Sequence, residues 1–474
     1  MLGLFGALNM GTRALQTQRQ GVEVAGHNLA NVNNPVYARQ RISISSTSGP
    51  DANLGSQGAG ADVASIQRLR SQVLDNQIVA EDSVQGSLNA QQKALEYAQA
   101  DMGQQIDRLA SGAEGASAAQ GVGGAHSLSS GLSELFSAFQ SLSTDPSSVT
   151  ERQVVVMKAA NLATQFSQAD DRLARLSASL DDSVKTDVSS ANELLSEIAR
   201  LNDLIRKSEL NLPGSANDLR DTRQMKIESL AGLVKVDAAE DASGMSISIN
   251  GTTMLTGSTV LETLATYQPA TGGLLVQTAS GTPLALTGGS IEGTITARDG
   301  AIASLHKDVN DLASVLITEV NALHQPGFSL SGSTGAKFFT GSNATDIQVN
   351  STIAANPTLI QVAGVAGAAG DNTVAVALGQ LSTRTHPALN GQTLNEYYAS
   401  SIASIGQSLS TLDNQVADQN VVDQMLSQQR DSVSGVSLDE EMTDMVRFQK
   451  AFEASARLIS TISDMLDIVV NLKR

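Results

Sequence analysis

Cysteine and tryptophan are both absent from this sequence of 474 residues, and aromatic residues make up only 3% of it. Without cysteine, the chain can form neither a disulfide framework nor a thiolate metal site. Aromatic side chains usually supply much of the area in large cores, and here Ala, Ser, Leu and Gln are abundant instead. We therefore expect long helices that pack through small and aliphatic side chains, in a chain long enough for about three domains.

The sequence also lacks a basic stripe, because 30 Lys and Arg stand against 48 Asp and Glu, a formal net charge of −18. The sequence therefore shows no basic surface for sequence-independent binding of nucleic-acid phosphates. No apolar run approaches the roughly 18 residues that cross a bilayer. Residues 1–6 lack the positive charge and apolar stretch of a signal peptide, so these features alone predict a soluble cytosolic protein.

No pattern of catalytic or metal-binding residues is found. The histidines form no His-Glu-x-x-His motif and no cluster with metal-ligand spacing. Ser304 and Lys307 form a Ser-x-x-Lys pair, but its Ser-Asp-Asn and Lys-Thr-Gly companions are missing. The Gly-rich run at 121–124 is not followed by Gly-Lys-Ser/Thr. We therefore expect no enzymatic activity, no cofactor and no metal; the histidines are His27, His126, His306, His324 and His386.

Residues 1–34 are predicted to form a helix with one narrow apolar stripe. Leu8, Leu15, Val22 and Leu29 recur every seven positions, the spacing of a coiled-coil seam. An Asn-rich run that closes with Pro35 should end the helix. A narrow stripe needs a partner, so these four residues are candidate assembly-interface residues.

Residues 437–473 are predicted to form the last helix. Ser437 and Glu440 have the spacing of a capping box, and Lys473 and Arg474 sit favourably at the negative end of the helix dipole. Apolar residues again repeat in steps of three and four. The candidate interface on this helix consists of Leu438, Met442, Met445, Phe448, Phe452, Ile459 and Leu466.

The two terminal stripes are natural partners for each other. Residues 1–41 hold four Arg and one Glu, a charge of +3, while residues 438–474 hold five basic and seven acidic residues, a charge of −2. Opposite charges favour a terminal pair, either parallel or antiparallel. A stripe of this kind can equally pair with another molecule, in which case it is a polymerisation surface.

The chain between these helices changes character near its middle. Helices are expected at 71–110, at 132–210 (two or three long ones), at 299–324 and at 393–432, with a strand at 41–45. From 233 to 298 the pattern alternates with period two, and Asn250-Gly251 predicts a hairpin turn. Loops rich in Gly are expected at 49–60 and 111–131, and residues 325–390 give no clear element.

The predicted fold class is mainly α with an inserted β-domain, an α+β multidomain protein. Long terminal coiled-coil helices pair the N- and C-terminus, and a helical middle domain carries a small β-rich outer domain. The expected boundaries are 1–60 plus 431–474 for the terminal assembly domain. The middle domain takes 61–215 plus 299–430, and the β-rich domain takes 216–298.

The first helix and the segment after it carry a specific motif. It consists of Gln18, Gly21, Gly26, Asn28, Ala30, Asn31, Pro35, Tyr37, Arg39 and Gln40. Physically, the glycines permit close helix contact and the Asn-rich run ends the helix. These positions resemble the N-terminal signature of the flagellar rod, hook and hook-associated proteins, although Val36 stands where that family usually has Gly.

Later motifs narrow the resemblance to one branch of these axial proteins. The runs 434–441 and 447–456 resemble the C-terminal end of the flagellar hook-associated protein 1 (FlgK) family. The run from Asn217 to Arg223, the β-rich stretch, and 320–328 followed by Phe338 and Phe339 resemble that family too. The resemblance extends over the whole chain, which is shorter than many members and is expected to carry a reduced outer domain.

The resemblance implies a structural role, secretion and a set of partners. It implies export through the flagellar secretion apparatus without a cleaved signal, and a ring of copies at the hook–filament junction that is needed for filament assembly. The implied partners are the chain itself, the hook protein and the second junction protein (FlgL). A cytosolic export chaperone (FlgN) would hold the C-terminal helix before export.

Two alternatives remain at this point. A hook or distal-rod protein would share the terminal motifs, but the run from Asn217 to Arg223 and the long helices argue against it. A secreted surface adhesin is the alternative from another class, with the β-domain as the binding part, although nothing in its sequence names a ligand.

Overall fold

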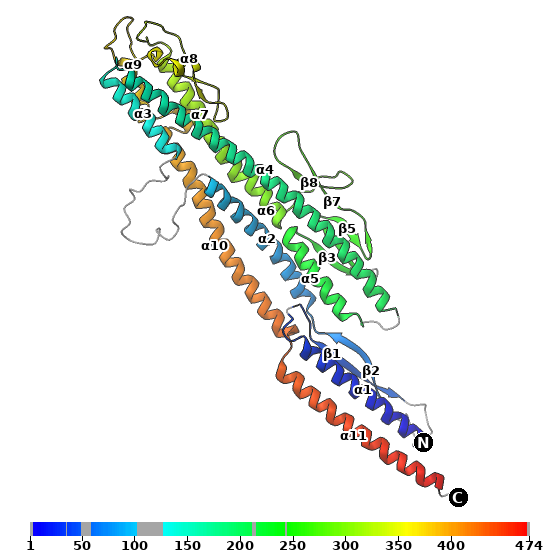
Figure 1. The fold of residues 1–474 in the computed structure, drawn as a ribbon. Helices are drawn as coiled ribbons and strands as arrows, with labels where there is room; N and C mark the ends of the chain where they lie inside the picture. Colours follow the sequence, from blue (N-terminus) through cyan, green and yellow to red (C-terminus); the bar gives the residue numbers. More distant parts are fainter. Residues whose placement is uncertain are drawn as a thin grey trace.

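The computed structural model describes residues 3–34, 36–48, 58–101, 127–210, 215–241 and 244–471. Several positions discussed above lie outside the described residues: Pro35, most of 49–60 and 111–131, the run 121–124, His126, Lys473 and Arg474. Figure 1 shows an elongated molecule with both chain ends at one end and a helical head at the other. The predicted fold class, mainly helical with a small β part and a terminal helix pair, is confirmed.

The ends of the chain form one helix pair, α1 (Leu4–Ala30) and α11 (Leu438–Asn471). Of the two expected arrangements the pair adopts the antiparallel one (Figure 1). A hairpin of β1 (Gln40–Ser48) and β2 (Gly58–Arg68), which includes the strand predicted at 41–45, lies along α1. There, Thr17 Oγ1 donates to the carbonyl of Ala61 at 3.0 Å.

Two helices fill the stretch from 132 to 210. They are α3 (Leu128–Thr144) and a single helix of 60 residues, α4 (Val149–Ser208). The N-cap serines Ser127 and Ser148 each accept a hydrogen bond from a backbone amide of the first turn, which fixes where both helices begin. Buried residues recur along all of α4, so this helix is a spine shared by the head and the body.

The body packs α2 (Gln72–Asp101), α5 (Asn217–Leu233), α6 (Ser290–Ala297) and α10 (Leu394–Ser434) beside α4. Glycines bring the backbones of these helices into direct contact. A Cβ atom at Gly86 would lie 2.1 Å from the carbonyl oxygen of Gly232, and one at Gly293 would lie 2.2 Å from that of Ser87. No side chain fits at either position, so both glycines are required by the helix crossings.

The β part is a four-stranded antiparallel sheet and a separate hairpin. The sheet runs in the order β3 (Asp237–Asp241), β4 (Gly244–Ile249), β5 (Thr252–Thr256) and β6 (Thr259–Val260), and the hairpin pairs β7 (Leu264–Tyr267) with β8 (Leu275–Thr278). The predicted turn is confirmed, since Asn250 and Gly251 join β4 to β5 with φ of 48° and 76°. Within 216–298 the chain also forms α5 at the start and α6 near the end.

The head contains α3, the start of α4, the first turns of α10, and α7 (Ala303–His324), which continues α6 through the π-helical turn η2 (Arg298–Ile302). It also contains α8 (Ser351–Ala355), α9 (Thr373–Gln380) and the short strands β9 (Phe339–Thr340) and β10 (Gln348–Val349). Five of the nine phenylalanines share its core, so the scarce aromatic residues are concentrated at one end of the molecule. They are Phe136, Phe139, Phe166, Phe338 and Phe339.

The irregular stretch 325–390 folds onto the head through a buried histidine. His324 is fully buried; its Nδ1 donates to the carbonyl of Ala336 at 2.8 Å, and its Nε2 accepts from the amide of Gln361 at 2.9 Å. Both bonds need the neutral ring with its proton on Nδ1. Burial lowers the pKa of His324 to about 4.

The head is expected to lose stability in mild acid through His324. The unfolded pKa is about 6.5 and the folded pKa is about 4, so the neutral form contributes fully above pH 6.5 and the contribution is lost as the pH falls towards 4. We expect a loss of about 3 kcal/mol over this range, measured by urea unfolding at several pH values. In His324→Gln this part of the pH dependence should vanish, whereas in the exposed-site control His27→Gln it should persist.

Candidate assembly site at the terminal helices

Glycines of α1 bring α1 and α11 together. A Cβ atom at Gly21 would lie 2.6 Å from the ring of Phe448, and one at Gly11 would lie 2.9 Å from Ile459. The side chains of Phe448 and Ile459 therefore lie in the space that a larger residue on α1 would fill. The contacts of 11 with 459 and of 21 with 448 also show the antiparallel register of the pair.

The predicted stripe of α1 lies beside this contact and not at its centre. Leu8, Leu15, Val22 and Leu29 are all half-buried. The buried face of α1 is made of smaller and more polar residues: Gly11, Thr17, Gly21, Val24, Ala25 and Asn28. Each leucine and valine of the stripe therefore keeps apolar surface that the chain itself does not cover.

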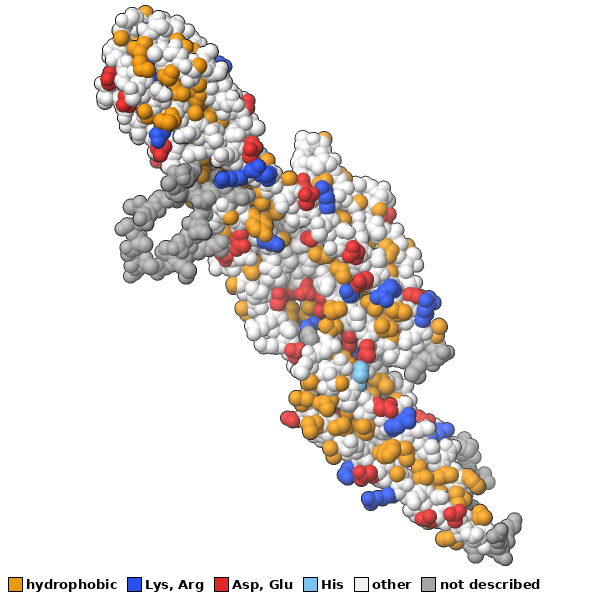
Figure 2. Space-filling model, in the orientation of Figure 1, with side chains coloured by type: hydrophobic (Ala, Val, Ile, Leu, Met, Phe, Trp, Pro, Cys, Tyr) orange, Lys and Arg blue, Asp and Glu red, His pale blue; other side chains and the backbone are white. Residues whose placement is uncertain are grey.

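On α11 the predicted residues divide between two environments. Phe448 is buried, while Met445, Phe452, Ile459 and Leu466 are half-buried on the side of α1. Leu438 and Met442 are 49% and 53% exposed. Further apolar residues of α11 are exposed as well: Val446, Leu458, Met465, Ile468, Val469 and Val470. Figure 2 shows hydrophobic side chains gathered over the terminal pair.

A buried asparagine organises the end of α1. Asn28 Nδ2 donates to the carbonyl of Gln40 at 2.8 Å and to Glu441 Oε2 at 2.9 Å. Its Oδ1 accepts from the hydroxyl of Tyr37 at 2.7 Å and from the amide of Gln40 at 2.9 Å. One amide thus joins α1, the segment after it and the first turn of α11, and every hydrogen-bonding site on it is used.

Arg39 holds the start of α11 from the other side. Its Nε donates to Glu441 Oε1 at 2.7 Å and its Nη1 donates to Glu440 Oε2 at 2.5 Å. The amide of Arg39 donates to the carbonyl of Ser434 at the end of α10. The carboxylate of Glu440 therefore binds Arg39.

The central motif on α5 completes the network. Asp221 is buried; it accepts from the amide of Ala38 and from Arg68 Nη1, both at 2.9 Å, and Arg70 Nε lies 3.3 Å away. Asp218 accepts from Gln40 Nε2 at 2.8 Å. The N-terminal and central motifs, far apart in the sequence, thus form one joint between the terminal pair and the body.

Burial sets the protonation of this joint. It raises the pKa of Tyr37, and the nearby carboxylates Asp218, Asp221 and Glu441 raise it further. The hydroxyl therefore keeps its proton and donates to Asn28. Burial also raises the pKa of Asp221, although the amide of Ala38 and the two arginines oppose that rise.

Removal of Glu441 should weaken the joint far more than removal of its neighbour. Glu441→Ala leaves Asn28 Nδ2 and Arg39 Nε without this acceptor, and we expect a loss of about 2–4 kcal/mol in the free energy of opening the joint in the assembled subunit. Glu440 is exposed, so Glu440→Ala is the matched control with a loss below about 1 kcal/mol. Hydrogen exchange of 28–40 in the assembled subunit distinguishes the two variants; equal losses would contradict the assignment.

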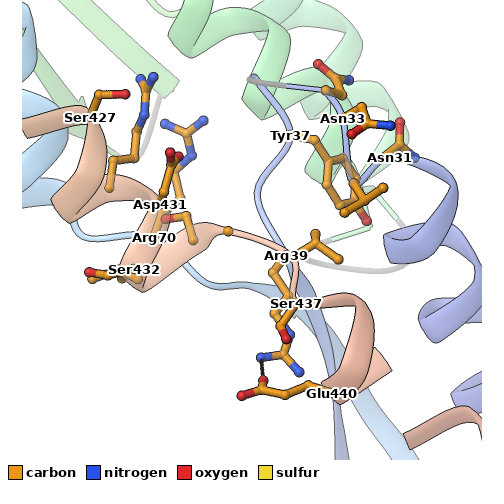
Figure 3. Close-up of a pocket in the computed structure, with 17 residues that line it drawn as sticks. Asn31, Asn33, Tyr37, Arg39, Arg70, Ser427, Asp431, Ser432, Ser437 and Glu440 are labelled. Carbon is orange, nitrogen blue, oxygen red and sulfur yellow. Dashed lines mark hydrogen bonds and ion pairs between the residues drawn. The ribbon is translucent and has the colours of Figure 1, made fainter. Parts of the chain in front are cut away.

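A polar groove of about 590 Å³ lies at the joint, between the Asn-rich segment after α1 and the connection from α10 to α11. Figure 3 shows Asn31, Asn33 and Tyr37 on one side and Ser432, Ser437 and Glu440 on the other, with Arg39 between them. Among the described residues no group of three or more His, Asp or Glu could hold a metal ion. Within the same ranges, no helix combines the length and apolarity that crossing a membrane requires.

The remaining residues of the N-terminal motif differ in burial. Gln18, Gly26 and Asn31 are half-buried and Ala30 is exposed. From the sequence alone, Arg68 and Arg70 were not identified as part of the joint, and Asp221 and Glu441 received no specific role. Asp221 lies in the run from Asn217 to Arg223, and Glu441 lies in the run 434–441. The resemblance of these two runs to the family was the only sequence signal for them.

Two family comparisons match the chain. Residues 120–339 match the family described as the flagellar hook-associated protein FlgK helical domain. Residues 427–472, which include all of α11, match the C-terminal region of the flagellar basal body rod FlgEFG proteins. The chain is therefore a structural component of the bacterial flagellum, and its C-terminal region is similar to that of the rod proteins.

Relatives that match the chain over its full length show which flagellar protein it resembles. The hook-associated protein 1 of Bacillus subtilis is 27% identical over 99% of both chains, and that of Escherichia coli is 22% identical over 98% of this chain and 99% of its own. The flagellar hook junction protein FlgK from Burkholderia pseudomallei shares the fold, with a TM-score of 0.61 and 16% identity over 76% of this chain and all of that one. Together with the helical-domain match, these relatives show that the chain is similar to flagellar hook-associated protein 1 over its whole length.

Proposed function

We propose that this protein is a structural subunit at the junction between hook and filament, needed for filament assembly, and that it has no catalytic role. The observation that carries the proposal is the end-to-end similarity to hook-associated protein 1, together with the shared fold of the flagellar hook junction protein FlgK. The joint of Asn28, Arg39 and Asp221 supports it, because it sets the direction of the terminal pair relative to the body.

The proposed partners follow from the same family. Copies of the chain form a ring and contact the hook protein and the second junction protein (FlgL). The half-buried stripe of α1 and the exposed apolar residues of α11 are the proposed contact surfaces. Before export, the apolar face of α11 serves the chaperone (FlgN), and after export the protein is extracellular, in the flagellum.

The three domains expected from the sequence have different proposed roles. The terminal domain, 1–60 plus 431–474, assembles along the axis. The helical middle domain, 61–215 plus 299–430, and the β-rich outer domain, 216–298, face outward and adjust lateral contacts. The β part shares one core with the lower body, around Ile247 and Val188, which is distinct from the core of the head.

A strain that lacks the gene tests the proposal. We expect electron microscopy to show hooks without filaments, and culture supernatants to contain flagellin as monomer. Missing hooks would place the protein in the rod or hook instead. Normal flagella would overturn the junction role and favour a surface adhesin.

The terminal pair is expected to be weakly ordered in the free monomer. Along α11 only Glu441, Phe448 and Ile462 are buried among the described residues, too little to offset the ordering entropy of a helix of this length. We expect hydrogen exchange of 5–30 to be fast in a proven monomer and slow after assembly. Strong protection of these amides in the monomer would contradict this prediction.

A further inference from the structure

One edge of the β1–β2 hairpin is covered by other parts of the chain. Thr17 Oγ1 on α1 donates to the carbonyl of Ala61 at 3.0 Å, and Asn217 Nδ2 on α5 donates to that of Ile66 at 3.0 Å. Both carbonyls belong to β2 and lie on the edge away from β1. The outer edge of β2 is therefore occupied at two positions.

The outer edge of β1 is open beyond its first residue. At Gln40 the side-chain amide of Asn28 accepts from the backbone N–H and donates to the carbonyl, as a neighbouring strand would. Backbone groups of an antiparallel strand face inward and outward alternately, and the register shift inside the hairpin adds its extra residue to β2. The outward direction is therefore repeated at Ile42, Ile44 and Ser46, and their outward groups receive no hydrogen bond from the residues that the structure describes.

This edge lacks the features that usually prevent strand addition. Residues 42–46 contain neither a charged side chain nor a proline, and Ile44 is 43% exposed. Its isoleucines also favour the extended conformation. The edge of β1 is thus a template on which a further strand can form main-chain hydrogen bonds.

A groove of about 470 Å³ lies beside this edge, between β1 and the start of α11. Ile42 and Ile44 line it from the hairpin. Val24 and Ala25 of α1 and Phe448 of α11 add apolar surface. An extended segment paired with β1 would therefore have room for apolar side chains next to the strand edge.

The charges of the groove indicate what else the segment carries. Glu441 is bound within the joint described above, and Asp444 lies 3.1 Å from Arg447. Arg41 also lines the groove; it is exposed and has no carboxylate partner in the described ranges of the chain. A carboxylate is therefore the complementary group for this arginine. β1 itself contains no acid, so β1 of a second copy cannot supply it.

We propose that β1 accepts an additional strand from another polypeptide, an extended segment that combines apolar side chains with a carboxylate. The segment pairs with the edge from Ile42 to Ser46 and extends the hairpin to three strands. Main-chain hydrogen bonds supply the affinity, while the groove and Arg41 select the segment. This docking surface does not depend on the junction role proposed above.

Binding of two fluorescent synthetic peptides to the full-length chain tests the proposal. Both peptides alternate valine and threonine; one has a central aspartate and the other a central lysine. We expect the aspartate peptide to bind and to slow hydrogen exchange at Ile42 and Ile44. The lysine peptide should bind about fivefold more weakly, and Arg41→Gln should reduce this difference.

Two variants at one position separate strand addition from simple apolar contact. Ile44→Pro removes the outward N–H without touching the ladder to β2, so binding should weaken about tenfold while Ser43 and Ser45 stay protected from exchange. Ile44→Val keeps both the N–H and a branched apolar side chain, and should bind like the unmodified chain.

The proposal is overturned if the aspartate peptide does not bind, or if Ile44→Pro and Ile44→Val bind it equally well. A dimer of the chain that Ile44→Pro abolishes would also overturn it, because the edge would then pair with a second copy. Equal binding of the two peptides to the unmodified chain would contradict the role of Arg41.

Discussion

Replacing Arg152 by alanine is expected to unfold the head at much lower urea concentration than in the unmodified chain. Arg152 is 1% exposed, and its guanidinium donates from Nε and Nη2 to the carbonyl of Pro146 at 3.0 and 2.7 Å, and from Nη1 to that of Ile360 at 2.5 Å. Burial lowers the pKa of Arg152 to about 10, which still leaves it charged near neutrality. It therefore fastens the loop before α4 and the segment before α9 to one point.

The expected loss is about 3 kcal/mol or more, because two buried carbonyls lose their donor and a cavity is left. Hydrogen exchange of 338–362 during urea unfolding should show the loss in the head first. Arg175→Ala, an exposed arginine on the same helix, is the matched control. Equal urea midpoints for the two variants would show that Arg152 does not fasten these segments.

Replacing Gly21 by leucine is expected to separate the terminal pair and abolish filament assembly while the head stays folded. The new side chain would occupy the position of the Phe448 ring, whose nearest carbon lies 2.6 Å from a Cβ at Gly21. Overpacking costs about 1–3 kcal/mol, which a pair with so few buried residues cannot absorb. Loss of hydrogen-exchange protection in α11 measures the separation of the two helices. Flagellin in the medium measures the loss of filament assembly.

Gly26→Ala is the matched control for this prediction. It is another glycine of the same motif on the same helix, but a Cβ there meets nothing within 4 Å. We expect it to assemble normally. Adding Phe448→Ala to Gly21→Leu should restore part of the protection, because it returns the missing space. Normal assembly of Gly21→Leu alone would mean that α1 and α11 do not pair this closely in the flagellum.

Local patterns in the sequence were sufficient for much of this architecture. The heptad spacing of apolar residues located the terminal helices, and their opposite charges suggested their pairing. Asn250-Gly251 located a hairpin, because a turn with positive φ at both residues strongly favours this dipeptide. Each of these features depends on residues close together in the chain, so it leaves a direct trace in the sequence.

The contact face of α1 could not be predicted in the same way. Periodicity detects apolar side chains and so selected Leu15 and Val22, whereas the helices meet where α1 has no side chain, at Gly11 and Gly21. Arg152 and Asp221 were missed for a related reason. Their partners, such as Ile360 and Arg68, lie far away in sequence, and no local pattern reports a buried charge whose partners come from distant segments.

The antiparallel terminal pair makes completion of the chain a condition for forming the proposed assembly surface. Asn28 and Glu441 touch although 413 positions separate them. Because a ribosome builds the chain from its N-terminus, α1 exists long before the helix that covers it. A molecule cut short at any point before residue 438 has no α11 at all, even if its head has folded. Because of this nested topology, only a finished subunit can present both halves of the proposed assembly surface.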